Sequence, residues 1–194
     1  MTPHYPPGAS PLDPDEAAGL IPGHISTQGQ LNEWEQANVL EGQRWALSRR
    51  NRADPLTENF VRKLHAKMFG KTWTWAGTFR TTGKNIGVDP VQIGVKLRDL
   101  LADARYWLEH GTYPLDEAAV RLHHRLVSVH PFANGNGRHA RMLADVISVR
   151  HGGIPFTWGG ANLVEPGRAR ERYLAALRHA DQNDLAVLLE FARS

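Results

Sequence analysis

The residues best suited to chemistry lie in one short segment, residues 130–141, which reads HPFANGNGRHAR. Gly135 and Gly137 allow backbone conformations closed to other residues, so consecutive N–H groups can point into one concavity. A helix is expected to begin just after this loop. The unpaired amides and the dipole at its N-terminus also favour an anion. The segment therefore predicts a phosphate site.

Three side chains around this loop could act on a bound phosphate. Arg138 and Arg141 are three residues apart in the expected helix, so they share a face and can reach the same anion. His130 comes just before the loop, where a ring nitrogen could take a proton beside the phosphate. Phosphate cradle, two guanidinium groups and one base together indicate chemistry on a nucleotide phosphate.

Other interpretations of the same segment are weaker. Gly135-x-Gly137-x-x-Ala140 formally matches a dinucleotide-binding fingerprint, but that fingerprint follows a strand, and the residues before it have helical spacing. A zinc site is disfavoured because the sequence has no HExxH motif, and His123 and His124 are adjacent and point to different helix faces. A glycine-rich turn between two helices, with an Asn cap and no chemistry, stays open as the structural alternative.

Helical elements must position this loop. Apolar spacing and capping signals predict helices over about 27–48, 54–70, 95–110, 116–130, 138–150, 168–179 and 184–193. Residues 71–93 alternate Thr, Trp, Phe, Ile and Val with glycines and predict a short β-hairpin or flap. The expected fold is all-α, with about seven helices and a small β-hairpin flap.

Length and composition limit the class of protein. The 194 residues predict one domain, preceded by a proline-rich arm over residues 1–23. The absence of cysteine excludes disulfides and thiolate sites, and no apolar run approaches a membrane span. The N-terminus does not resemble a secretory signal, so a cytoplasmic location is expected. A net charge of +3 is too small to indicate nucleic-acid binding.

The segment 130–141 also resembles the signature of Fic-domain (Fic/Doc) proteins, HPFx[D/E]GNGRxxR. Trp75-Ala76-Gly77-x-x-Arg80 resembles the entry to that family's flap, and residues 172–181 resemble its last core helix. The resemblance divides the chain into residues 1–54, an arm plus a helix, and residues 55–194, a Fic-like catalytic core. The arm and the 27–48 helix together resemble a bacterial subgroup called mobile mystery protein B.

The resemblance implies a protein adenylyltransferase, which moves AMP from ATP to a Ser, Thr or Tyr hydroxyl of a target protein. It implies that His130 is the base and that Asn136 and the amides around Gly135 and Gly137 bind the α- and β-phosphates. By the same resemblance Arg138 would hold the β-phosphate and Arg141 the γ-phosphate. The target segment would add as a strand to the flap, whose docking residues are Thr81, Thr82, Gly83, Lys84, Asn85, Ile86, Gly87 and Val88.

Three alternatives stay open at this stage. The chain could transfer another phosphate-containing group, such as UMP or phosphate. It could be a catalytically dead module that binds proteins, or a basic binder of nucleic acid. The oligomeric state, the nucleotide base and the target are not indicated by the sequence.

One position departs from the signature. Residue 134 is acidic in most active members, where the carboxylate helps to hold Mg²⁺, and it is Asn134 here. An amide oxygen can still ligate Mg²⁺ but brings no charge. Mg²⁺ is therefore expected as a cofactor with weakened protein ligation.

A regulatory motif is also similar to one in this family. Residues 37–42, ANVLEG, resemble the inhibitory pattern [S/T]xxxE[G/N] with Ala in the first place. The resemblance implies that Glu41 pairs with Arg141 and fills the space of the γ-phosphate. The alternative is a solvated Glu on a helix face.

Overall fold

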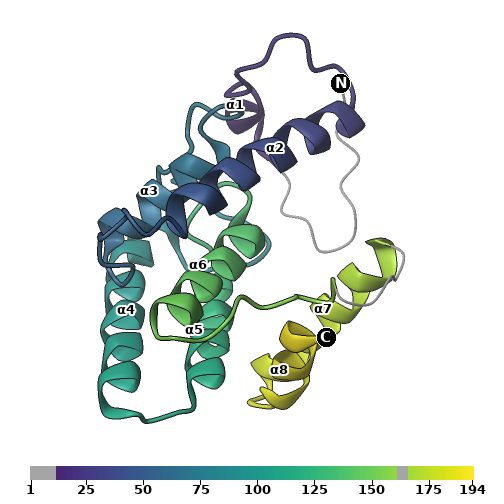
Figure 1. Ribbon diagram of the computed structural model, residues 1–194. Helices are drawn as coiled ribbons and strands as arrows, with labels where there is room; N and C mark the ends of the chain where they lie inside the picture. Colours follow the sequence, from purple (N-terminus) through teal and green to yellow (C-terminus); the bar gives the residue numbers. More distant parts are fainter. Residues whose placement is uncertain (1–11, 161–165) are drawn as a thin grey trace.

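The computed structural model describes residues 12–160 and 166–194, and within these ranges the chain is helical (Figure 1). The elements are α1 (Pro14–Ala17), α2 (Gln28–Ala46), α3 (Glu58–Phe69), η1 (Pro90–Gln92, a 3₁₀ turn), α4 (Ile93–His110), α5 (Leu115–Val129), α6 (Asn136–Arg150), α7 (Pro166–Asp181) and α8 (Ala186–Arg193). The all-α class predicted from the sequence is confirmed.

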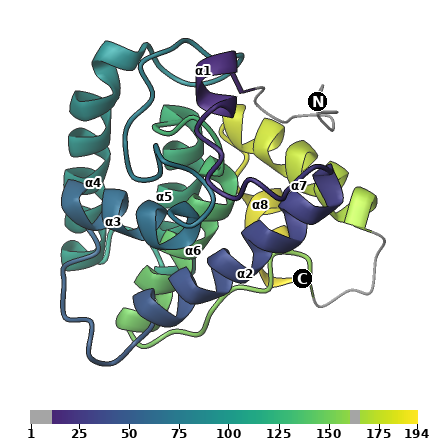
Figure 2. The same cartoon turned by 90° about the horizontal axis from the view of Figure 1, so that it is seen from above.

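The core forms where α3, α4, α5 and α6 pack together. Apolar residues recur every three or four positions on each of these helices, so each presents one buried stripe. Phe60, Leu64 and Met68 are the stripe of α3, and Leu122 and Leu126 belong to that of α5; all are almost fully buried. Helix α2 lies across α3, and α7 and α8 pack on the other side of α5 (Figures 1 and 2).

Several helix starts differ by two or more residues from the sequence prediction, and those of α3 and α6 have a clear local cause. Asp54 was expected to cap α3, but its carboxylate accepts the amide of Leu56 in a turn, and Thr57 caps the helix by accepting the amide of Phe60. Helix α6 begins at Asn136 rather than Arg138, because Gly135 already serves as its N-cap. The expected cap of α2 is confirmed, since Thr27 and Gln30 form a capping box.

The expected β-hairpin is not formed. In the described ranges residues 71–89 make turns and bends, and the one β-bridge pairs Leu20 with Trp73. The physical reason is Arg80, whose guanidinium donates to the carbonyls of Thr82, Val88 and His130. Those carbonyls are therefore not available to a strand ladder, and an isolated two-stranded hairpin is marginal in any case.

No helix in the two described ranges combines the length and the apolar character needed to cross a membrane.

Candidate active site

His130 lies at the junction between α5 and the loop that leads to α6. It ends α5 with φ 53° and ψ 59°, a left-handed conformation that is uncommon for a side-chain-bearing residue. Arg80 fixes it there by donating from Nε to the His130 carbonyl at 2.6 Å. Gly87 lies so close that an added Cβ would be 2.6 Å from that of His130. The flap segment therefore borders the histidine directly.

The His130 ring is neutral at pH 7. Burial is the main cause and lowers its pKa to about 4, with nearby Arg80 and Lys84 acting in the same direction. Its Nδ1 lies 3.4 Å from the Val127 carbonyl oxygen. That contact favours the proton on Nδ1 and leaves Nε2 as the nitrogen that can accept a proton.

Side chains inside the core brace the loop that follows His130. Asn136 accepts the amide of Phe132 at 2.9 Å and donates to its carbonyl at 2.8 Å. Phe132 is fully buried and stacks on His65, with ring centroids 3.8 Å apart. The Asn136 side chain, expected at the phosphates, thus braces the loop through Oδ1 and one hydrogen of Nδ2. Its second Nδ2 hydrogen is not used in these two bonds.

His65 was not singled out from the sequence, although it ties two parts of the site together. Its Nε2 donates to the Asn134 carbonyl and its Nδ1 accepts the amide of Gly77, both at 3.0 Å. Burial holds its pKa well below the ordinary value, so the neutral tautomer that makes both bonds persists. The available signal was a histidine on the apolar stripe of α3, one turn after Val61.

The start of α6 has the geometry of an anion site. Gly135 adopts φ 78°, and a Cβ there would be 2.6 Å from the Phe69 ring, so only glycine fits. Gly135 has no side chain with which to cap α6, and the first amides of a helix have no intrahelical partner. These amides and the helix dipole favour an anion. Arg138 and Arg141 follow on the first turns, as the sequence predicted.

Arg138 is engaged by a residue that sequence reasoning missed. Its Nη1 lies 2.7 Å from Oε2 of Glu35 on α2. The Glu35 side chain is only 8% exposed, and its other oxygen accepts the indole N–H of Trp73 at 2.7 Å. The signal was present in the sequence, because Leu31, Glu35 and Asn38 follow helical spacing and place a carboxylate on the inward stripe of α2.

The expected contact between Glu41 and Arg141 is not formed. Glu41 is exposed and pairs with Lys71 at 2.7 Å. It follows Glu35 by six residues, which is about 240° around an α-helix, so it faces another side. Gly42 in the same motif packs on Met68, where a Cβ would be 2.5 Å from Cγ. Close helix packing explains this glycine.

Arg141 instead lies against α7. Its guanidinium is 5.1 Å from the centre of the Tyr173 ring, and its Nε is 3.3 Å from the Gly137 carbonyl oxygen. The Tyr173 hydroxyl is 3.2 Å from His123 Nε2. Burial raises the pKa of Tyr173 to about 12, so it stays neutral beside the arginine. Helix α7 thus lies against the second arginine of the expected phosphate site.

Asn134 does not resemble a prepared metal ligand. Its side-chain oxygen accepts the amide of Gly135 within the loop. The described residues also contain no cluster of three or more His, Cys, Asp or Glu side chains that could hold a metal ion.

Taken together, the arrangement joins a neutral histidine, a helix N-terminus and two arginines. Such a set can bind a phosphate chain and accept a proton from a nucleophile that attacks it. The flap segment borders one side of this site, and Glu35 of α2 contacts Arg138.

Comparison with known families finds that the Fic/DOC family model matches residues 55–148. Protein adenylyltransferase fic-1 of Caenorhabditis elegans is 31% identical over 146 residues, which are 71% of this chain and 27% of that relative. Protein adenylyltransferase Fic of Drosophila virilis is 28% identical over 141 residues, 70% of this chain and 27% of that relative. The chain therefore spans about a quarter of the length of these curated relatives.

Two solved structures show how the fold compares. A Fic-1 structure from C. elegans superposes with a TM-score of 0.66 at 26% identity, covering 91% of this chain and 51% of that chain. BepC from Bartonella tribocorum, with bound AMPPNP, has a TM-score of 0.68 at 19% identity, covering 91% and 96%. The likeness to BepC shows the fold alone.

Proposed function

Residues 55–148 form a Fic/DOC family domain, and from this premise we propose that the protein transfers AMP from ATP to a hydroxyl group of a target protein. The observation that carries the proposal is the neutral, buried His130 beside the N-terminus of α6, with Arg138 and Arg141 on its first turns. The names of the relatives, protein adenylyltransferases, support the choice of group. The arm and α2 further support placing the chain in the mobile mystery protein B subgroup.

In the proposed reaction the target hydroxyl oxygen attacks the α-phosphorus of ATP. The hydroxyl proton goes to Nε2 of His130, a new P–O bond forms to the target, and the bond to pyrophosphate breaks. The ring is neutral at pH 7 and so can accept this proton. The left-handed backbone held by Arg80 fixes the direction in which the ring points.

The phosphates would bind at the start of α6. The backbone amides near Gly135, Asn136 and Gly137 are suited to the α- and β-phosphates. Arg138 would take the β-phosphate and stabilise the leaving pyrophosphate, and Arg141 would take the γ-phosphate. Flap residues 81–88 would hold the target segment, because this stretch borders His130 through Gly87.

Magnesium is proposed only as an ion that arrives with the triphosphate. Asn134 is the side chain that the family resemblance assigns to it, and its oxygen is occupied by the amide of Gly135. These residues do not fit a site that holds Mg²⁺ by protein ligands alone. No step of the proposed reaction depends on protein ligation of the metal.

We also propose that α2 restrains the enzyme through Glu35. Its carboxylate holds Arg138 in a partly buried ion pair at 2.7 Å, and this arginine is needed for the pyrophosphate. A phosphate must therefore compete with Glu35 for the same guanidinium.

Labelled nucleotides test the proposed function. The wild-type protein and a Glu35→Gln variant are incubated with ATP labelled at the α- or the γ-phosphate, and the protein is analysed for label and intact mass. Label from the α-phosphate with the mass of AMP supports the proposal. Label from the γ-phosphate would indicate a phosphotransferase, and the mass of UMP after incubation with UTP would indicate uridylyl transfer.

A binding measurement distinguishes a catalytically dead module from a protein that does not bind ATP under the assay conditions. Nucleotide binding is measured on the same samples by calorimetry. Binding of ATP without label on any protein, in wild type and in Glu35→Gln alike, would contradict transferase activity and indicate a binding module.

A further inference from the structure

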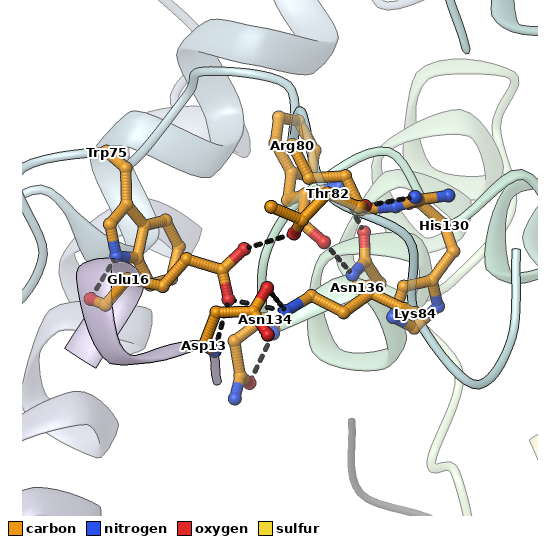
Figure 3. Close-up of polar contacts among 11 residues, drawn as sticks. Asp13, Glu16, Trp75, Arg80, Thr82, Lys84, His130, Asn134 and Asn136 are labelled. Atoms are coloured by element: carbon orange, nitrogen blue, oxygen red, sulfur yellow. Dashed lines mark hydrogen bonds and ion pairs between the residues drawn. The ribbon is translucent and has the colours of Figure 1, made fainter. Parts of the chain in front are cut away.

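Lys84 is a basic residue of the flap, and the N-terminal segment, residues 13–21 of the same chain, covers its side chain. Nζ of Lys84 lies 3.0 Å from Oδ2 of Asp13 and also contacts Oε2 of Glu16. The side chain of Lys84 is only 3% exposed. The hydroxyl of Thr82 donates to the other Glu16 oxygen at 3.1 Å. Figure 3 shows the carboxylates of Asp13, the N-cap of α1, and of Glu16, within α1, meeting at Lys84.

The backbone of this segment is fitted to the chain beside the flap as well. Thr74 donates to the Gly19 carbonyl at 2.9 Å, and Ile21 donates to the Thr72 carbonyl at 2.8 Å, around the bridge between Leu20 and Trp73. A Cβ on Gly19 would lie 2.8 Å from Thr74 and Trp75. Residues 19–21 thus pair with residues 72–74 around a single bridge, while α1 and its N-cap carry the two carboxylates that reach Lys84.

The covered surface is the one that a target would need. Lys84 and Thr82 belong to the stretch 81–88, which borders His130 through Gly87 and is fixed to it by Arg80. Lys84 is close enough to His130 to help lower the pKa of that ring. A peptide whose carboxylate sat on Lys84 would therefore lie beside the proposed base.

We propose that Thr82 and Lys84 form a docking site for a carboxylate side chain of the target, and that residues 13–21 occupy this site in cis until an acidic target segment displaces them. The inference rests on the proposed function for the meaning of "target". The contact itself is chemically specific, because a buried ammonium group needs a carboxylate partner. The fitting partner is a segment with an acidic side chain near the hydroxyl to be modified.

Chemical footprinting of the full chain tests the cis contact. Lysines are acylated under limiting conditions and read out by mass spectrometry, with Lys71, whose side chain is 63% exposed, as internal reference. The double variant Asp13→Asn with Glu16→Gln keeps the shape and the caps of α1 but removes both charges. Acylation of Lys84 should rise about tenfold or more, the factor expected from losing a charge-assisted hydrogen bond. Asp15→Asn is the matched control, since Asp15 is exposed on the same helix.

A second variant tests the same cis contact without changing any charge. Gly19→Ala introduces a Cβ against Thr74 and Trp75, whereas Gly23→Ala introduces one into open space. The first should also expose Lys84 to acylation, and the second should not.

A peptide shows whether the docking site accepts a ligand in trans. The probe is a fluorescent peptide of residues 12–22, LDPDEAAGLIP, and its counterpart with Asn and Gln at the two acidic anchor positions. We expect the native peptide to bind the double variant about tenfold more tightly than it binds wild type, and the peptide substituted at both anchor positions to bind neither protein.

These outcomes separate the inference from the proposed function. Unchanged Lys84 acylation in both variants, or equal binding of the native and the substituted peptide, overturns the docking site even if AMP transfer is observed. Exposed Lys84 and selective peptide binding support the docking site even if no AMP transfer is found, in which case the proposed function alone fails.

Discussion

His130 combines two properties that rarely coincide in one residue, a left-handed backbone and a buried titratable ring. The backbone conformation costs about 1–3 kcal/mol and persists only where its surroundings hold it. Here the guanidinium of Arg80 supplies that hold by binding the carbonyl of His130 together with two flap carbonyls. The direction of the proposed base and the position of the flap are therefore set by the same side chain.

Replacing the base should remove transfer while sparing the nucleotide site. We expect His130→Ala to lower the rate of AMP transfer by about 10²–10⁴, the usual contribution of a general base. Nucleotide affinity should change little, because the arginines and the start of α6 are intact. The measurement compares labelling rates and ATP affinity at equal folded fraction. Labelling at the wild-type rate would show that another group takes the proton.

A charge at residue 134 should change the response to magnesium. Asn134→Asp adds a carboxylate, which holds a hard cation better than an amide oxygen. We expect the variant to reach half-maximal activity at a lower Mg²⁺ concentration than wild type. Titration of activity with Mg²⁺ checks this for both proteins. Superimposable curves would exclude residue 134 from the metal environment, and lost activity would assign the Asn134 side chain a role in the loop.

Among the helices, α2 links the N-terminal part of the chain to the start of α6, where Glu35 contacts Arg138. We expect Glu35→Gln to raise the rate of AMP transfer about tenfold, because Arg138 is no longer held by a charge-assisted bond. Glu41→Gln is the matched control, since it removes the same charge six residues along the same helix, at an exposed pair with Lys71. Labelling rates and ATP affinity are measured for both. Activation by Glu41→Gln alone would restore the assignment based on the sequence motif.

The helices were largely predictable from sequence, because each buries a continuous apolar stripe against the others. The segment 130–141 was also predictable, since its two glycines and the arginines at 138 and 141 follow one another along the chain. The contacts of Glu35, His65 and Tyr173 were not, because each joins segments far apart in sequence. The motif around Glu41 misled for a definable reason. A glycine that follows a glutamate serves helix packing as readily as inhibition.

At the scale of the whole molecule, four histidines that are buried within the described ranges make folding sensitive to acid. Burial lowers the pKa of His65 well below the ordinary value, that of His123 to about 3, and those of His130 and His139 to about 4. The unfolded chain would bind these protons from about pH 6.5 downward. The contribution of these histidines to the free energy of unfolding is therefore fully present above about pH 6.5, and it is lost as the pH falls from about 6.5 to 4.

Asp145 acts in the opposite direction. Burial raises its pKa to about 6, so between about pH 4 and 6 the folded state holds a proton that the unfolded state has lost. We expect a net uptake of about three protons on unfolding near pH 5, or roughly 4 kcal/mol per pH unit. Denaturant unfolding over a pH series measures this slope. Asp145→Asn should steepen it, and a free energy of unfolding constant between pH 7 and 5 would contradict the assignment.

The fluorescence of Trp73 can report whether α1 and α2 are in place. The indole of Trp73 donates to Glu35 and stacks on Trp75, with ring centroids 5.1 Å apart, while the indole of Trp75 donates to the carbonyl of Glu16. One aromatic pair thus touches α2 through one ring and α1 through the other. Departure of either helix would change the polarity around an indole and hence the emission of the intact protein. Fluorescence can therefore test, in real time and without a label, whether and in which order nucleotide and target release the N-terminal segments, as we propose.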